Sequence, residues 1–313
     1  MPDIVISEFM DEAAITGGLA GFDVHYDPTL VDRPEALLAL LAEARGLIVR
    51  NRTQVRPELL AAAPRLKAIG RLGVGLDNID VEACAGRGIA VFPATGANDA
   101  SVAEYVISAA LMLLRRAWFA TDRVSAGQWP RTDLMGRELM GKSLGLLGFG
   151  AIARETARRA VPFGVTILAH DPFLGADDPA FRSLGVQPVA FDDLLRLSDV
   201  LSLHVPLTAA TRDCIGATEL AAMKPDAILI NAARGGVVDE AALVAALKAG
   251  TIGGAALDVF AVEPLKADKA EIFVGCPNLI LTPHIAGVTA ESNTRVSWVT
   301  VEAVRRALEG VPA

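Results

Sequence analysis

Three polar side chains in the last third of the sequence have the types needed to move a proton and bind an anion. His284 is a candidate general acid or base, because an imidazole titrates near neutral pH. Glu263 can hold the second ring nitrogen of that histidine, and Arg234 can bind a carboxylate with its planar guanidinium. Each alone also fits a structural explanation: a structural histidine, a loop bend or a surface turn. Together they could supply the base and the cation that oxidation of a hydroxyl beside a carboxylate would need, and such a reaction would also need a hydride acceptor.

A glycine-rich segment provides a candidate site for that hydride acceptor. Gly148-Phe149-Gly150-Ala151-Ile152-Ala153 lies between a predicted strand and a predicted helix that reaches Ala160. The first glycine permits a tight turn, the second lets a pyrophosphate approach the backbone, and the small Ala153 lets helix and strand pack. The phosphates would lie at a helix N-terminus, where free N–H groups and the helix dipole favour anions. The segment therefore predicts a dinucleotide site.

Asp171 indicates which dinucleotide is bound. It follows the next predicted strand, 21 residues after Gly150. A carboxylate at this place can accept hydrogen bonds from both hydroxyls of the adenosine ribose and repels a 2′-phosphate. The pattern therefore predicts NAD rather than NADP. The alternative is a pair of turn glycines followed by an aspartate that caps a strand end.

Short apolar runs alternate with helical patterns along almost the whole chain, which predicts parallel sheets covered by helices on both faces. In the first third we expect strands at Ile4–Ser7, Asp23–Tyr26, Gly46–Val49, Ala68–Arg71 and Ala90–Phe92, and helices at Glu35–Ala44 and Glu58–Ala63. A longer helix is expected from Ser101 to about Phe119; it is apolar all round and is therefore expected to be buried between elements or at an interface. Later strands are expected at Leu144–Leu147, Val165–His170, Val200–His204, Ala227–Asn231, Ala255–Val259 and Leu279–Thr282.

The fold class predicted by this order is α/β, with two doubly wound parallel-sheet domains. Residues 98–285 carry the glycine-rich segment and are expected to form a Rossmann NAD-binding domain. The terminal helix pattern from Asn293 to Leu308 has no strand of its own, so we assign it to the first domain. Residues 1–97 and 286–313 then form a discontinuous flavodoxin-like substrate domain.

Composition excludes several classes of protein. Of 313 residues, 52% are hydrophobic, which excludes a disordered chain, and the net charge of −8 argues against nucleic acid or a membrane surface as partner. Cys84, Cys214 and Cys276 are widely spaced and form no metal-binding pattern, so we expect no metal site and a reducing compartment. The N-terminus has no signal-peptide pattern, and we expect a cytoplasmic protein.

The segments 231–236, 258–264 and 282–287, with the glycine-rich segment, resemble the D-isomer-specific 2-hydroxyacid dehydrogenase family. Gly73-Val74-Gly75-Leu76-Asp77-Asn78-Ile79-Asp80 and Asn98-Asp99-Ala100-Ser101-Val102-Ala103-Glu104 extend the resemblance to nearly the whole chain. It is nearest to the D-3-phosphoglycerate dehydrogenase branch, and residues 6–12 also resemble bacterial sulfolactate dehydrogenases. The resemblance implies reversible hydride transfer between NAD and C2 of a 2-hydroxy acid, with Arg234, Glu263 and His284 as catalytic residues.

The resemblance also extends the expected cofactor site. It implies that Asp258 binds the nicotinamide carboxamide, although a turn cap is a competing explanation for this residue. Arg234 and His284 are expected to contact the cofactor as well as the substrate. Further residues expected to line the cofactor site are His204, Pro206 and Ala232.

Substrate contacts are expected mainly from the first domain. The backbone N–H groups of Val74 and Gly75 match those that hold the substrate carboxylate in the family. Arg50, Asn51 and Asn98 match positions on the substrate side. If Arg50 lines the pocket, the substrate carries a second anionic group on C3. Both 3-phosphoglycerate and 3-sulfolactate meet this condition, and the motifs do not separate them.

Two arginines and the oligomeric state are left open. Arg52 and Arg131 are either solvated surface side chains or helpers at the site, Arg131 from a neighbouring subunit. The apolar helix after Ser101 suggests a homodimer through the NAD-binding domain. The rival to an enzyme is an NAD(H)-sensing, corepressor-like binding protein. Within the family the alternatives are a hydroxypyruvate or glyoxylate reductase and a formate dehydrogenase, which would carry glutamine in place of Glu263.

Overall fold

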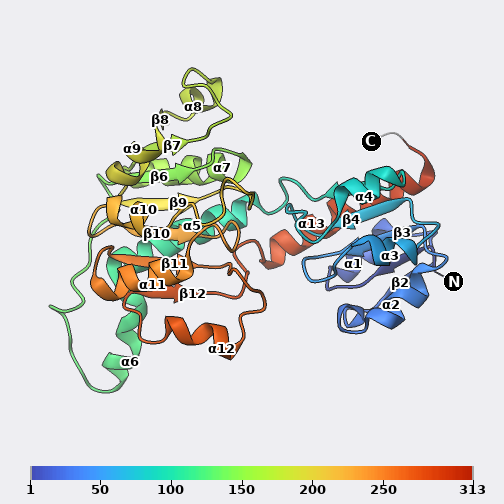
Figure 1. The fold of residues 1–313 in the computed structure, drawn as a ribbon, viewed down its shortest axis with the longest axis horizontal. Coiled ribbons are helices and arrows are strands. Elements are labelled where there is room, and N and C mark those ends of the chain that lie inside the picture. The colour runs from blue at the N-terminus through green and yellow to red at the C-terminus, as the bar shows by residue number, and fades with distance from the viewer. Residues whose placement is uncertain (1, 312–313) are drawn as a thin grey trace. The chain divides into compact units, whose positions relative to one another are not determined.

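The computed structural model describes residues 2–311, and these separate into two compact units (Figure 1). Unit 1 comprises the described residues up to Asn98 together with those from Val288 onward, and unit 2 comprises Asp99–Gly287. Helix α13 (Ala290–Glu309) follows unit 2 in sequence but packs on the sheet of unit 1. The chain therefore passes twice between the units, once after Asn98 and once after Gly287.

The described part of unit 1 is built on five parallel strands in the order β2-β1-β3-β4-β5. This is the flavodoxin-like order, so the expectation for the first domain is confirmed. Each strand lies within one residue of a predicted run. The strands are β1 (Ile4–Ile6), β2 (Val24–Tyr26), β3 (Gly46–Val49), β4 (Ala68–Arg71) and β5 (Ala90–Pro93).

Both faces of this sheet are covered by helices. Ile4 and Ile48 point to a core shared with α1 and α13, whereas Val5 and Leu47 point to a core shared with α2, α3 and α4. Position 70 on β4 requires glycine, because a Cβ on Gly70 would lie 2.5 Å from Cγ2 of Thr300 on α13. The remaining helices of unit 1 are α1 (Glu12–Gly18), η1 (Leu30–Asp32), α2 (Pro34–Leu41), α3 (Pro57–Ala61) and α4 (Val81–Gly86).

The described residues of unit 2 include seven parallel strands in the order β12-β11-β10-β9-β6-β7-β8. The order reverses between β6 and β9, as in a Rossmann fold, and ligands bind at the carboxyl ends of the strands beside such a reversal. The short edge strand β8 was not expected. The strands are β6 (Ser143–Leu147), β7 (Thr166–His170), β8 (Gln187–Pro188), β9 (Val200–Leu203), β10 (Ile228–Asn231), β11 (Gly254–Leu257) and β12 (Leu279–Leu281).

Helix α5 (Asp99–Arg115) starts earlier and ends sooner than the sequence predicted. It ends because Arg116 adopts a left-handed φ of +54°, which a helix cannot continue through. Its apolar residues, among them Val106 and Leu113, are buried against α7 and the sheet of unit 2. These residues of α5 are therefore covered inside unit 2, whereas Ile107, Leu111 and Met112 are only half-buried, and a dimer through this helix stays a prediction.

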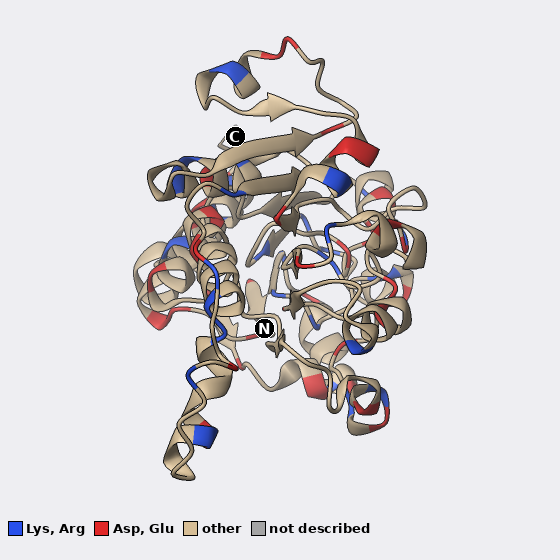
Figure 2. Ribbon diagram, turned by 90° about the vertical axis from the view of Figure 1, so that its left-hand side faces the viewer, with Lys and Arg blue, Asp and Glu red and all other residues tan. Residues whose placement is uncertain are grey.

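The other helices of unit 2 connect its strands. They are η2 (Ala117–Phe119), α6 (Ala120–Ser125), α7 (Ala151–Ala160), η3 (Val161–Phe163), α8 (Pro179–Ser183), α9 (Phe191–Leu197), α10 (Ala217–Ala222), α11 (Glu240–Ala249), α12 (Ala267–Ala270) and η4 (Glu271–Phe273). Acidic and basic residues are interspersed over helices and loops of both units (Figure 2). No helix within residues 2–311 is long and apolar enough to cross a bilayer.

Candidate active site

The glycine-rich turn between β6 and α7 is shaped for close approach to the backbone. Gly148 has φ +87°, and a Cβ there would lie 2.7 Å from the carbonyl oxygen of His204, so only glycine fits. A Cβ on Gly150 would instead meet open space. Phe149 is fully buried and stacks on Phe181 with ring centroids 4.8 Å apart. The one large side chain of the turn thus lies in the core, and the start of α7 has room for a phosphate.

Asp171 holds this turn against the end of β7. Its carboxylate accepts hydrogen bonds from the N–H groups of Phe149 (2.9 Å) and Phe173 (3.0 Å). A carboxylate offers about four lone-pair positions, so these bonds leave capacity for ribose hydroxyls. Capping the turn and binding a ribose are therefore compatible roles for one side chain. His170 beside it is fixed by a 3.0 Å contact between its Nδ1 and the carbonyl oxygen of Val189.

His204, Pro206 and Ala232, expected at the cofactor site, lie at the carboxyl ends of the neighbouring strands β9 and β10. The Nε2 of His204 is 3.0 Å from Oγ of Ser202. Burial lowers the pKa of His204 to about 4, so its ring is neutral near pH 7. The backbone of His204, rather than its ring, makes the close contact with Gly148.

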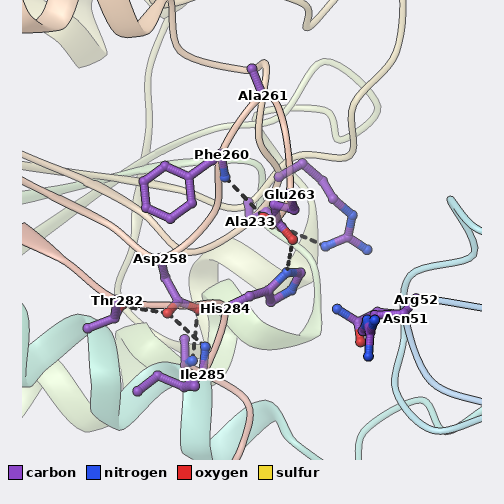
Figure 3. A network of polar contacts seen from close by, with 12 residues as sticks. Asn51, Arg52, Ala233, Asp258, Phe260, Ala261, Glu263, Thr282, His284 and Ile285 are labelled. Carbon is purple, nitrogen blue, oxygen red and sulfur yellow. Dashed lines mark hydrogen bonds and ion pairs between the residues drawn. The ribbon is translucent and has the colours of Figure 1, made fainter. Parts of the chain in front are cut away.

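His284 and Glu263 form a hydrogen-bonded pair (Figure 3). The Nδ1 of His284 lies 2.7 Å from Oε2 of Glu263, while Oε1 accepts the N–H of Phe260 at 3.0 Å. Burial raises the pKa of Glu263, but the hydrogen bond from His284 and the charges of His284 and Arg234 outweigh it, so the pKa lies below its usual range. Because an ionised carboxylate only accepts, Nδ1 carries a proton, and Nε2 is the nitrogen left to take up or release one.

Arg234 lies in a tight turn after β10. Asn231 shapes this turn: its amide donates to the carbonyl oxygen of Arg234 at 2.9 Å, and its Oδ1 accepts the N–H of Ala233 at 3.1 Å. A Cβ on Gly235 would lie only 1.7 Å from the carbonyl oxygen of Phe260. The Arg234 turn and the loop that begins at Phe260 are therefore packed backbone against backbone.

Asp258 is buried beneath the turn that carries His284. Its Oδ1 accepts hydrogen bonds from Oγ1 of Thr282 (2.6 Å) and N–H of Ile285 (2.8 Å), and its Oδ2 accepts the N–H of Ala286 (2.8 Å). Burial raises the pKa of Asp258, and these hydrogen bonds offset only part of the rise. His284 itself has φ +56°, a conformation that costs a residue with a side chain about 1–3 kcal/mol. These bonds match the turn cap left open by the sequence; a contact with the nicotinamide stays a prediction.

In unit 1, the loop after β3 carries Arg50 and Asn51. The carboxylate of Glu8, which is 4% exposed, holds this loop through its backbone. Oε1 accepts the N–H groups of Arg50 and Thr53 at 2.9 Å each, and Oε2 accepts those of Asn51 and Arg52 at 3.3 and 3.1 Å. A buried carboxylate that the sequence analysis did not single out therefore fixes the path of the loop.

The guanidinium of Arg50 is held on one side. Its Nη1 donates to the carbonyl oxygen of Phe9 and to Oδ1 of Asn293, both at 3.0 Å, and the group lies 5.7 Å from the centroid of the Phe9 ring. Burial lowers the pKa of Arg50, and the nearby charge of Glu8 acts in the opposite direction. The side chain is a half-buried cation, and partial removal from water strengthens its attraction for an anion.

The other residues expected on the substrate side follow β4 and β5 of unit 1. Within residues 2–311, the N–H groups of Val74 and Gly75 donate no hydrogen bond to another protein group. The Oδ1 of Asn98 is buried and likewise has no partner in the described chain. All of these residues lie at the carboxyl edge of the unit 1 sheet, as the residues after β3 also do.

The two arginines left open by the sequence, Arg52 and Arg131, are both exposed side chains. Arg52 forms a surface ion pair with Asp32, which fits the surface explanation for this residue. Arg131 is exposed in the segment that follows α6. Its action from a neighbouring subunit stays a prediction.

The sequence analysis missed four residues that build this arrangement: Glu8, Tyr105, Gly235 and Thr282. The last two stand inside segments already singled out, but their packing partners were unknown. The hydroxyl of Tyr105 is 2.6 Å from Oγ1 of Thr282, a contact between residues 177 apart in sequence. Such distant pairs have no signal in local sequence patterns.

Comparison with known proteins identifies the family. Residues 107–286 match the model of the D-isomer specific 2-hydroxyacid dehydrogenase, NAD binding domain. The (S)-sulfolactate dehydrogenase of Chromohalobacter salexigens is 56% identical over 308 residues, 98% of this chain and 99% of that protein. The chloroplastic D-3-phosphoglycerate dehydrogenase 2 of Arabidopsis thaliana is 40% identical over 99% of this chain, which spans 49% of that longer protein.

A solved structure supports the same family assignment. The D-lactate dehydrogenase of Aquifex aeolicus, complexed with NAD and lactic acid, superposes with a TM-score of 0.85 at 30% identity, covering 98% of this chain and 96% of that one. The expected cofactor, NAD, and the expected class, a dehydrogenase, are thereby confirmed. The chain belongs to the D-isomer specific 2-hydroxyacid dehydrogenase family.

Proposed function

We propose that the protein interconverts a D-configured 2-hydroxy acid and its 2-oxo acid, and that the substrate carries a second anionic group on C3. We take 3-sulfolactate as the first candidate and D-3-phosphoglycerate as the second. The His284–Glu263 pair, joined at 2.7 Å, is the observation that carries the chemistry. The order of candidates rests on the 56% identity to a sulfolactate dehydrogenase of nearly the same length.

The proton is handled by His284. In oxidation, Nε2 takes the proton of the C2 hydroxyl, and in reduction it returns that proton to the 2-oxo oxygen. Glu263 keeps the proton on Nδ1 and stabilises the imidazolium that forms. The guanidinium of Arg234 binds the C1 carboxylate and polarises the C2 oxygen. When bound, NAD supplies the hydride acceptor.

The geometry of the glycine-rich turn supports the proposed cofactor site. The turn from Gly148 to Gly150 and the first amides of α7 would hold the pyrophosphate, because Gly150 leaves open space at that point. Asp171 would accept the ribose hydroxyls with its remaining lone pairs.

The proposed substrate contacts of unit 1 divide between backbone and side chains. The N–H groups of Val74 and Gly75, which have no protein partner within residues 2–311, are suited to a carboxylate. The guanidinium of Arg50 is suited to a sulfonate or phosphate, because Phe9 and Asn293 hold its Nη1 and the fork has further donors. This arrangement supports a substrate with two anionic ends.

NADH oxidation by the purified protein, with a panel of 2-oxo acids, tests the proposal. The panel contains 3-sulfopyruvate, 3-phosphohydroxypyruvate, hydroxypyruvate, oxaloacetate, pyruvate, glyoxylate and 2-oxoglutarate. The highest kcat/KM should belong to an acid with a C3 anion and should fall at least about tenfold in Arg50→Ala, since a charge-assisted hydrogen bond contributes about 1.5–3 kcal/mol. A preference for hydroxypyruvate or glyoxylate would replace the substrate assignment with a reductase. Tight NADH binding without turnover of any acid would favour the sensor.

We also propose that the partner is a second copy of this chain. The exposed large apolar residues of unit 2 include Trp118, Trp129 and Met135, and the two last are 76% and 73% exposed. All three stand in the segment around α6, which extends away from the rest of unit 2 (Figure 1). We assign the dimer contact to this segment of the NAD-binding domain. Sedimentation velocity should show a dimer for the wild type and a monomer for Trp118→Ser with Trp129→Ser; a wild-type monomer would remove the assignment.

A further inference from the structure

We propose that Tyr105 and Thr282 are positioning residues of the reaction: their hydroxyls form a directed hydrogen-bond chain that holds the turn carrying His284. The inference rests on the proposed role of His284 as the proton acceptor. Within residues 2–311 neither hydroxyl is hydrogen-bonded to the ring of His284, so both would act through Asp258 and the backbone of the turn.

The direction of the chain follows from its last member. Thr282 donates its single hydroxyl proton to Oδ1 of Asp258 at 2.6 Å. Its oxygen can then only accept from Tyr105, whose hydroxyl lies 2.6 Å away. Tyr105 therefore donates to Thr282, and Thr282 donates to Asp258. Burial raises the pKa of Tyr105 to about 12, so this donor keeps its proton across the working range of pH.

The hydrogen-bond chain ends at Asp258, which holds the backbone of the turn that carries His284. Asp258 binds the N–H groups of Ile285 and Ala286, and its own carbonyl oxygen accepts the N–H of His284 at 2.8 Å. The left-handed φ of His284 is unfavourable for a residue with a side chain and persists only if its surroundings enforce it. Moving Asp258 therefore moves the turn and the imidazole with it.

The other end of the hydrogen-bond chain, Tyr105, lies in the longest helix of unit 2. Tyr105 belongs to α5, which runs for 17 residues and packs against α7 and the strands β10, β11 and β12. Tyr105 stands seven residues after Asn98 and Thr282 five residues before Gly287, the two points where the chain passes between units. The contact thus ties both connecting segments together inside unit 2.

A purely structural explanation competes with this one. The two hydroxyls could do no more than satisfy a buried carboxylate, because such a group is costly when its hydrogen bonds are missing. Their removal would then lower the melting temperature and leave the turnover of the folded protein unchanged. A positioning role predicts loss of kcat, since a misplacement of about 1 Å at a reacting group can cost about 100-fold in rate.

The test compares Thr282→Val, Thr282→Ser and Tyr105→Phe in the full chain. Matched controls are Thr156→Val, which removes a buried hydroxyl of α7 bonded to the carbonyl of Ile152, and Tyr26→Phe, which alters the other tyrosine. For each protein we would measure kcat for NADH oxidation with 3-sulfopyruvate, 3-phosphohydroxypyruvate and hydroxypyruvate in parallel. NADH affinity by fluorescence and the melting temperature complete the set.

We expect kcat of Thr282→Val to fall about 10- to 100-fold and that of Tyr105→Phe about 3- to 10-fold, with NADH affinity within about threefold of wild type. Thr282→Ser, which keeps the hydroxyl, should restore kcat to within about threefold, and both controls should match wild type. Unchanged kcat in Tyr105→Phe, or equal loss in Thr282→Ser and Thr282→Val, would overturn the inference. The Tyr105→Phe and Thr282→Ser variants decide the matter if Thr282→Val does not fold. Full activity of His284→Gln would instead overturn the proposed function, and with it this inference.

Discussion

Substituting Gly235 by alanine is expected to disable the enzyme by moving the Arg234 turn away from the Glu263 loop. The added Cβ would lie 1.7 Å from the carbonyl oxygen of Phe260, whereas real Cβ atoms essentially never approach closer than 3.0 Å. The two backbones must therefore separate by about 1.3 Å, the difference between these distances. Neither neighbour is the flexible end of a side chain, so local rotation cannot relieve the contact. A shift of about 1 Å can cost about 100-fold in rate, and kcat should fall by at least that factor.

The assay for Gly235→Ala is kcat for NADH oxidation with the three acids named above, with NADH affinity and melting temperature measured on the same preparations. Gly175→Ala is the matched control, because its Cβ would meet nothing within 4 Å and its φ needs no glycine. We expect Gly175→Ala to keep wild-type kcat and stability. A folded Gly235→Ala protein with kcat within about threefold of wild type would refute the reasoning, because a displacement above 1 Å would then have no effect on the chemistry.

Three further substitutions test separate parts of the site. Glu263→Gln should lower kcat about tenfold, since a charged hydrogen bond (about 1.5–3 kcal/mol) becomes a neutral one (about 0.5–1.5 kcal/mol). Because the pKa of Glu263 is lowered in the fold, the ionised carboxylate stabilises the protein above its unfolded pKa, and this stabilisation is lost on acidification. The melting temperature of the variant should therefore depend less on pH between about 5 and 3 than that of the wild type. Asn293→Ala, which frees the guanidinium of Arg50, should raise KM several-fold for acids with a C3 anion and leave KM for pyruvate unchanged; equal changes for both would indicate a general disturbance. Asp171→Ala should raise the ratio of NADP to NAD use at least about tenfold, and an unchanged ratio would remove Asp171 from cofactor choice.

The elements of the fold were predictable because their signals are local. Runs such as Gly46–Val49 and Val200–Leu203 are short, mainly apolar and bounded by polar residues, and the strands fall on them. The end of α5 was predicted wrongly: apolar residues resume at Ala117–Phe119 after two arginines, but Arg116 turns the backbone into the left-handed region and ends the helix. The edge strand β8 comprises only Gln187 and Pro188, too short to leave a pattern.

The site was predictable only in its chemistry. The side-chain types of Arg234, Glu263 and His284 indicate their roles, whereas their relative placement depends on contacts between distant segments. Gly235 illustrates this difference, because its sequence neighbourhood indicates a turn but not the loop against which that turn packs. Tyr105 is a partly apolar residue on an apolar helix, and its polar role depends on a threonine 177 residues away.

Glu8 constrains how the proposed substrate can be bound in unit 1. Successive backbone N–H groups in such a loop commonly form a concave site for an anion. Here the buried carboxylate of Glu8 already accepts the N–H groups from Arg50 to Thr53. A second anion cannot use those amides, so a sulfonate or phosphate at this loop must be bound by side chains, foremost the guanidinium of Arg50.

The loop after the next strand, β4, is different, since the amides of Val74 and Gly75 have no partner in the described chain. The backbone of the loop after β4 therefore suits the substrate carboxylate, and the side chains of the loop after β3 suit the sulfonate or phosphate. This difference would fix which end of the substrate each loop binds.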